Sequence, residues 1–290
     1  MAVSTTTATE LTREQVSTIL TRPLEQQSVF LAAGPRIVDT DGSPVRLPAA
    51  PVSTVDELEW TGENELIPEV DPEFDEVTLL PSTMKSVKVI TRYSNELARQ
   101  SVVALDAALR DRLVSDVAAK IDGQLLSAEG DGITTPRGLF AYEGVQTVDV
   151  DGALTLDALM DGYGLALGAN VDPSKLRLFL RPGDYMALRR IKDSTGRYLL
   201  QPDASTGGIV VPTLGATAHI STRIPEGRAA LVDMGHIAVA RDLAPSVKIL
   251  TERYADYDQQ AIRVVARYDA APTEPAAVVT FGGITDAADA

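Results

Sequence analysis

Cysteine is absent from the 290-residue sequence, and histidine occurs only twice. Without cysteine there is no disulfide framework, no thiolate nucleophile and no cysteine-type zinc or iron–sulfur site. The two histidines, His219 and His236, leave little for a histidine-rich metal site, and both contexts favour a structural or surface role. No apolar run approaches the roughly 18 residues of a membrane span, and the N-terminus lacks a secretory pattern. We therefore expect no membrane partner and synthesis in a cytoplasm.

Basic residues are also scarce, because 26 Lys and Arg stand against 41 Asp and Glu, a net charge of −15. Such a balance argues against a protein that grips nucleic-acid backbone. Ten of the acidic residues lie between positions 51 and 80, a stretch without Lys or Arg. Strand-like residues around Val77 and Val89 predict a long two-stranded excursion here. An isolated ribbon is marginal in water, so we expect it to lie on another surface, such as a second subunit.

The path from Gly34 to Pro51 is rich in Gly and Pro, which predicts an extended arm rather than a packed core element. The strongest helical pattern follows over residues 101–127, roughly 40 Å long. Its apolar residues recur every fourth position and give one broad apolar face. They are Leu105, Leu109, Leu113, Val117, Ile121 and Leu125.

The second half of the chain mixes helices and strands. Thr155 predicts the N-cap of a helix that runs to about Leu167. Leu176–Leu180 predicts a buried strand, and Pro182 starts another helix, over about 184–191. Further strands are predicted at 209–211, 216–221, 229–232, 237–240, 247–253, 260–268 and 276–281.

No sequence motif supports an enzyme. Neither G-x-S-x-G nor H-E-x-x-H occurs. The glycines of residues 162–168 depart from the dinucleotide fingerprint and favour close helix packing. Asp71–Asp75 begins like a calcium loop, but Glu76 stands where glycine is needed and Ser82 where glutamate is needed. We expect no catalytic, cofactor-binding or metal site. A basic cluster at residues 189–197 is either an ordinary helix end or a docking site for an acidic partner surface.

The order of segments resembles the major capsid proteins of tailed bacteriophages, the Hong Kong 97 fold family. The most specific similarity is LFLRPGDYMALRRIKDSTGRYLL (Leu178–Leu200), a strand, a proline-started helix and a turn. The other similar segments are Val87–Ser101, the helix 102–127 ending in GQLLSAEGDG (Gly123–Gly132), TPRGLF at Thr135–Phe140, Ile224–Asp242 and Arg253–Phe281. The resemblance covers about residues 25–282.

The resemblance implies an α+β capsid fold with an N-terminal arm, an extended two-stranded loop, a long spine helix, and peripheral and axial domains. It divides the chain into an N-terminal segment and arm (1–50), the extended loop (51–93), the peripheral domain with the spine helix (94–140), the axial domain (141–245), and the closing peripheral strands with the C-terminal tail (246–290).

The resemblance also implies a non-enzymatic major capsid protein without cofactors. Such a protein assembles in the host cytoplasm as pentamers and hexamers into the icosahedral shell of the virion. The shell encloses double-stranded DNA without sequence-specific binding. Implied partners are further copies of the chain, a portal protein, and a separate scaffold, protease or cement protein. An encapsulin-like nanocompartment shell is the alternative in the same fold, and a soluble acidic enzyme is the alternative from another class.

We expect the acidic loop of one subunit to contact a neighbour. The loop residues are Glu63, Glu65, Glu69, Asp71, Glu73, Asp75 and Glu76. The candidate basic docking residues are Lys85, Lys88, Arg92, Arg110, Arg112, Arg189, Arg190 and Arg197. Some members of the family also form a covalent cross-link from Lys, Asn and Glu. Gln260 and Arg267 stand near the Asn and Glu positions and Lys85 is only near the Lys, so no cross-link is expected.

Overall fold

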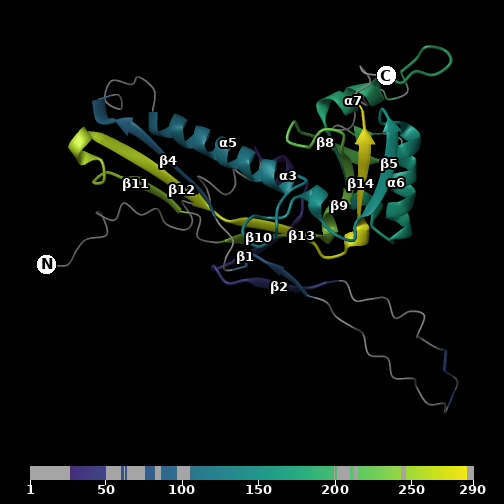
Figure 1. The fold of residues 1–290 in the computed structure, drawn as a ribbon, viewed down its shortest axis with the longest axis horizontal. Coiled ribbons are helices and arrows are strands. Elements are labelled where there is room, and N and C mark those ends of the chain that lie inside the picture. Colours follow the sequence, from purple (N-terminus) through teal and green to yellow (C-terminus); the bar gives the residue numbers. More distant parts are fainter. Residues whose placement is uncertain are drawn as a thin grey trace.

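The computed structural model describes residues 27–49, 60, 61, 63, 76–81, 86–96, 105–198, 200, 210, 211, 215–242 and 246–285. These residues form an elongated molecule with two lobes (Figure 1). One lobe holds the long helix α5 (Leu105–Leu125) beside a three-stranded sheet. The other holds a six-stranded sheet with helices α6 (Leu156–Gly168) and α7 (Pro182–Arg189). No helix in the described ranges is long and apolar enough to cross a membrane.

The six-stranded sheet has the order β5-β14-β9-β6-β8-β7, so β5 forms one of its edges. Every residue of the central strand β9 is buried, as expected for a strand covered on both faces. The strands are β5 (Gln146–Gly152), β6 (Leu176–Leu180), β7 (Val210–Val211), β8 (Ala216–Ile220), β9 (Ala229–Asp233) and β14 (Val278–Ile284).

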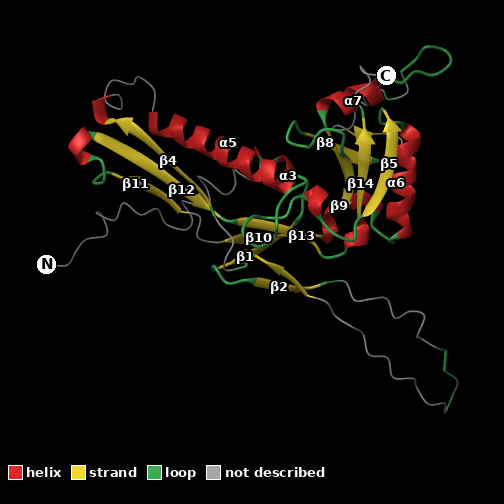
Figure 2. Ribbon diagram, viewed as in Figure 1, coloured by secondary structure: helices red, strands yellow, loops and turns green. Residues whose placement is uncertain are grey.

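Two three-stranded sheets build the lobe of the long helix (Figure 2). The first is ordered β11-β12-β4 and the second β1-β10-β13. Val89 of β4 pairs with Val264 of β12, and both join Val117 and Ile121 of α5 in one hydrophobic cluster. The strands are β4 (Val87–Ser94), β11 (Ser246–Leu250) and β12 (Gln259–Ala266), and β1 (Arg36–Thr40), β10 (Ile237–Asp242) and β13 (Tyr268–Pro272).

A two-stranded ribbon, β2 (Val45–Pro48) with β3 (Glu76–Leu79), forms the root of the acidic excursion. Leu79 and Leu80 are buried against Ala238 and Ala240 of β10. The root strands thus enclose residues 49–75, and β4 pairs with β12 in a different sheet.

The chain crosses between the lobes three times, and the first crossing runs from α5 through residues 126–145 to β5. β9 leads through a short 3-10 helix into β10, and β13 leads through another into β14. The short helices are α3 (Val29–Ala32), η4 (Leu139–Ala141), η5 (Pro173–Lys175), η6 (Met234–His236), η7 (Ala255–Tyr257) and η8 (Pro275–Ala277). One hydrophobic cluster joins α5 and its sheets to residues of β6, β9 and β14, and a second cluster lies between the six-stranded sheet and its helices.

Several predicted elements are confirmed. Leu113 and Leu125, like the apolar residues between them at the same spacing, are buried, as the helical pattern requires. Thr155 caps α6 by accepting a hydrogen bond from the Ala158 amide at 3.2 Å. The buried strand at Leu176–Leu180 has the predicted bounds.

Other expectations were wrong in detail. The arm segment contains strand β1, which pairs in parallel with β10, because a neighbour distant in sequence satisfies its backbone. The predicted strand at 260–268 is two strands, β12 and β13, which belong to different sheets. Strand β5 was not predicted because only two of its seven residues, Val148 and Val150, are apolar and pack in the core. Helix α7 begins at Pro182 itself and ends at Arg189.

Candidate functional site

The point where the N-terminal segment enters the body is fixed by Asp122 of α5. Its carboxylate accepts hydrogen bonds from the Ser28 hydroxyl at 2.6 Å and from the Val29 and Phe30 amides at 2.8 and 3.2 Å. The acceptor therefore satisfies donors at the N-terminus of α3 that have no partner within the helix. Burial raises the pKa of Asp122, and the hydrogen bonds from Ser28, Val29 and Phe30 oppose that rise.

A second buried carboxylate, Asp269 of β13, holds the root of the ribbon. It accepts from the Leu80 amide at 2.8 Å and from the Ala270 amide at 3.0 Å. Leu80 has φ of +51°, a left-handed backbone conformation that residues other than glycine rarely adopt. Burial raises the pKa of Asp269 to about 6. The hydrogen bond from the Leu80 amide to the buried Asp269 thus fixes where strand β3 joins the body of the fold.

Two half-buried arginines make ion pairs beside this root. The Arg241 guanidinium donates to both oxygens of Asp39, at 2.7 and 2.9 Å, across the β1–β10 pair. Arg267 lies 3.7 Å from Asp242 and donates to the Pro81 carbonyl at 3.4 Å. The described strands on both sides of residues 49–75 are therefore held to the neighbouring sheet by these contacts.

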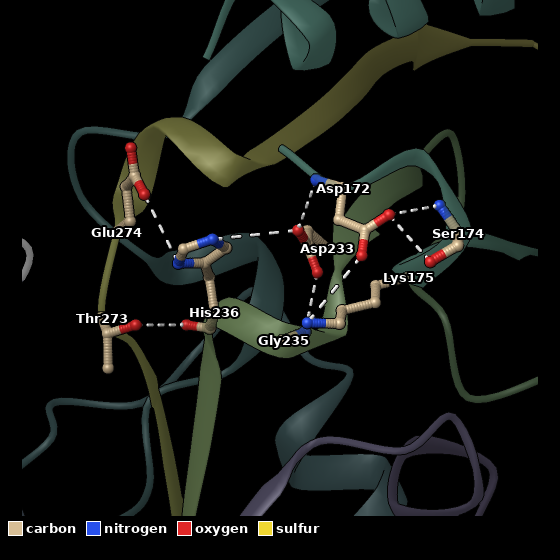
Figure 3. A network of polar contacts seen from close by, with 8 residues as sticks. All are labelled: Asp172, Ser174, Lys175, Asp233, Gly235, His236, Thr273 and Glu274. Carbon is tan, nitrogen blue, oxygen red and sulfur yellow. Dashed lines mark hydrogen bonds and ion pairs between the residues drawn. The ribbon is translucent and has the colours of Figure 1, made fainter. Parts of the chain in front are cut away.

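The junction between the lobes carries a polar network (Figure 3). Asp233 ends β9, is only 1% exposed, and accepts from the Gly235 amide at 2.7 Å and the Asp172 amide at 3.3 Å. The His236 imidazole lies between Asp233 and Glu274, with closest nitrogen–oxygen distances of 3.9 and 3.4 Å. The Thr273 amide and hydroxyl both donate to the His236 carbonyl, at 2.8 and 3.0 Å. The network thus joins the crossing from β9 to β10 with the crossing from β13 to β14.

His219 has a packing role. Its ring stacks on Phe179, with centroids 5.5 Å apart, and burial lowers its pKa. The predicted structural role of both histidines agrees with these contacts.

The glycine-rich part of α6 packs closely against the sheet. A side chain on Gly162 would clash with the ring of Phe281 on β14. This contact agrees with close helix packing rather than a nucleotide loop.

Two of the predicted docking residues, Lys88 and Arg92, project from one face of β4. Val87 and Val89 pack toward α5, so the alternating Lys88 and Arg92 face the opposite way, and both are exposed. The cross-strand register brings Arg263 of β12 and Lys248 of β11 onto the same face. We call these four residues the basic sheet face. Sequence reasoning missed Arg263 and Lys248, because only strand pairing brings them beside Lys88.

The other predicted docking residues lie elsewhere. Arg112 is exposed on α5 and donates to Asp116 at 3.2 Å. Arg189, Arg190 and Arg197 lie at or after α7, in the other lobe. The side chains of Lys85 and Arg110 lie outside the described part.

The acidic loop residues are only partly described. Glu63 is exposed in a turn, and Glu76 of β3 lies 3.8 Å from Arg46 of β2. The remaining predicted loop residues, Glu65, Glu69, Asp71, Glu73 and Asp75, lie outside the described residues.

Enzyme-like features do not converge at one place in the described ranges. They contain no group of three His, Asp or Glu side chains that could hold a metal ion. A cavity of about 530 Å³ lies between β4, α5 and the loop at 134–136, and both apolar and polar residues line it. They are Ser86, Val87, Lys88, Val89, Lys120, Ile121, Gln124, Leu125, Thr134, Thr135, Pro136 and Tyr268. No carboxylate or imidazole is among these lining residues.

Comparison with known proteins agrees with this architecture. The sequence profile of the Phage capsid family matches residues 10–282. The capsid of a native GTA particle superposes with a TM-score of 0.68 at 16% identity, over 89% of this chain and 90% of that chain. The Mycobacterium phage Adephagia structure gives 0.66 at 16% identity, over 89% and 90%. A virus-like particle from Pyrococcus furiosus gives 0.57 at 13% identity, over 92% and 98%.

No curated protein sequence matches the chain. The structural similarities, all at low identity, confirm the α+β capsid fold. The profile match spans nearly the whole sequence and confirms the resemblance. The chain therefore belongs to the phage capsid family, and it is a non-enzymatic structural component of the virion shell that assembles with copies of itself.

Proposed function

We propose that the chain is the major capsid protein that assembles as pentamers and hexamers into an icosahedral shell around phage double-stranded DNA. The family match over residues 10–282 carries this proposal. The similar GTA capsid was computed with C5 symmetry, which supports fivefold rings for this chain also. A portal protein is a further proposed partner, together with a separate scaffold, protease or cement protein.

The acidic loop is proposed to lie on the basic sheet face of a neighbouring subunit. Ten acidic residues between positions 51 and 80 have no basic residue among them. The basic sheet face offers four cations around Ile90, which is 44% exposed. Each exposed ion pair contributes only about 0–1 kcal/mol, but a shell repeats the contact at every subunit.

Charge reversal on each side tests this contact. Changing Glu69, Asp71, Glu73 and Asp75 to Lys is expected to lower particle yield, and so is the pair Lys88→Glu and Arg92→Glu. The pair Lys88→Gln and Arg92→Gln is the matched control, with a smaller expected loss because it removes attraction without adding repulsion. Unchanged particle yield in the reversed variants would refute the contact.

An encapsulin-like compartment is the second candidate function. The similarity to the virus-like particle from Pyrococcus furiosus supports this second candidate. Electron microscopy of particles, combined with nuclease treatment and nucleic-acid extraction, separates the two. Nuclease-protected double-stranded DNA is expected for the phage shell, and particles that hold a protein cargo instead would favour the compartment.

A further inference from the structure

One segment of the six-stranded lobe carries acidic but no basic residues. Residues 144–168, which include β5 and α6, contain four aspartates and no Lys or Arg. All four aspartates are exposed, and within the described residues none of them has a basic partner at ion-pair distance. They are Asp149, Asp151, Asp157 and Asp161.

The exposed side of α6, which carries Asp157 and Asp161, also presents apolar side chains to solvent. Leu159, Gly162 and Ala166 are the buried residues of α6, and they turn toward the sheet. On the opposite side of the helix, Met160, Leu165 and Leu167 are 41–49% exposed. Gly164 lies among them with open space above it, so the surface is accessible to a partner. We call these three side chains with Asp157 and Asp161 the acidic edge. Asp149 and Asp151 are not part of it. They alternate along β5 with Val148 and Val150, which pack with α6, so they face the opposite side of the sheet.

A surface of opposite charge lies at the end of α7. Arg189, Arg190, Lys192 and Arg197 have no carboxylate at ion-pair distance among the described residues. The nearby Asp193 instead accepts from the Thr195 amide and hydroxyl and from the Arg197 amide, which closes its own turn.

Apolar residues again accompany these charges. Met186 is 46% exposed and lies one turn before Arg189 and Arg190 on the same helix side. Tyr198 is 51% exposed, with the Lys192 ammonium 4.9 Å from its ring centroid. We call Met186, Tyr198 and the four cations the basic end.

The two surfaces are complementary but separate within one chain. α6 runs along the β5 edge of the lobe, whereas α7 lies at its top (Figure 1). Each combines exposed apolar side chains with unpaired charges of one sign, an arrangement that steers and orients association. Since members of this family assemble with copies of themselves, a second copy supplies the missing opposite surface.

We propose that the acidic edge of one subunit docks on the basic end of the next, head to tail, around a closed ring. A contact between two different patches of identical subunits generates rings when the rotation closes. The proposal rests on the proposed shell function, and it names the lobe surfaces that hold neighbours together. In this proposal, the acidic partner of the basic cluster at residues 189–197 is the acidic edge of another copy.

Charge swapping in the full-length protein tests the pairing. One variant carries Asp157→Arg and Asp161→Arg, a second carries Arg189→Asp and Arg190→Asp, and a third carries all four changes. Assembly is measured by light scattering and electron microscopy as a function of protein concentration. Each two-residue variant is expected to need about tenfold more protein for half-maximal assembly, and the combined variant to return to within about threefold of the parent.

The design contains its own controls. The two-residue variants change net charge in opposite directions, so an effect of net charge alone would move them oppositely. Circular dichroism melting of unassembled subunits separates misfolding from lost docking. A combined variant that assembles no better than the weaker pair would overturn the contact, as would parent-like assembly of both pairs. Failure of the parent to form any closed particle would instead contradict the shell function.

Discussion

Replacing Asp269 by Asn is expected to change how subunit stability depends on pH. Burial raises the pKa of this acid from 3.8 to about 6 in the folded state. The folded protein therefore binds more protons than the unfolded chain between about pH 4 and 6, and stability falls as pH rises through that window. At about 1.4 kcal/mol per pKa unit, the ionised Asp269 costs about 3 kcal/mol at pH 7.

The hydrogen bonds that Asp269 accepts determine how much stability the asparagine variant loses. Asp269 uses one oxygen for Leu80 and the other for Ala270, and asparagine has only one carbonyl oxygen. Leaving one buried amide unsatisfied costs about 1–3 kcal/mol. The variant should therefore be about 1–3 kcal/mol less stable than the parent at pH 4, where the parent is protonated. At pH 7 the two should be nearly equal, or the variant slightly more stable.

Urea unfolding of unassembled subunits at pH 4 and pH 7.5 measures this difference, with size-exclusion chromatography to confirm the unassembled state. All other acids titrate in both proteins and cancel from the difference. Asp269→Ala is the control, since it removes both acceptors and should be less stable than Asp269→Asn at both pH values. A parent–variant difference that stays constant between pH 4 and 7.5 would refute the reasoning.

Three further outcomes follow from the described contacts. Gly162→Ala should lower stability by about 1–3 kcal/mol in thermal melts because its methyl group meets the Phe281 ring, whereas Gly164→Ala, with open space, should be neutral or stabilising. Asp122→Ala should cost about 1–3 kcal/mol and speed limited proteolysis of the segment before α3, and equal cleavage rates would contradict its anchoring role. Boiled particles should migrate as monomers on SDS gels, and a covalent ladder would show that a cross-link forms.

Local patterns predicted the elements that depend on local chemistry. The four-residue spacing from Leu113 to Leu125 specifies the buried side of α5, and Thr155 specifies the start of α6. Strand β6 could be predicted because four of its five residues are large and apolar, and Arg177 is the one exception. In each case the signal lies within about twenty residues of sequence.

The remaining features depend on pairing between distant residues. β1 is stabilised by β10, about 200 positions away, so its surrounding glycines and prolines gave a misleading signal. Asp122 and Asp269 could not be distinguished among 41 acidic residues, because burial is decided by packing. The basic sheet face likewise requires the β4–β12–β11 register.

Electron microscopy of the purified full-length protein tests the central claim most directly. The shell function predicts closed icosahedral particles in which both fivefold and sixfold rings are visible. Protein that remains a monomer or dimer at high concentration, under every assembly condition and also when isolated from virions, would contradict it.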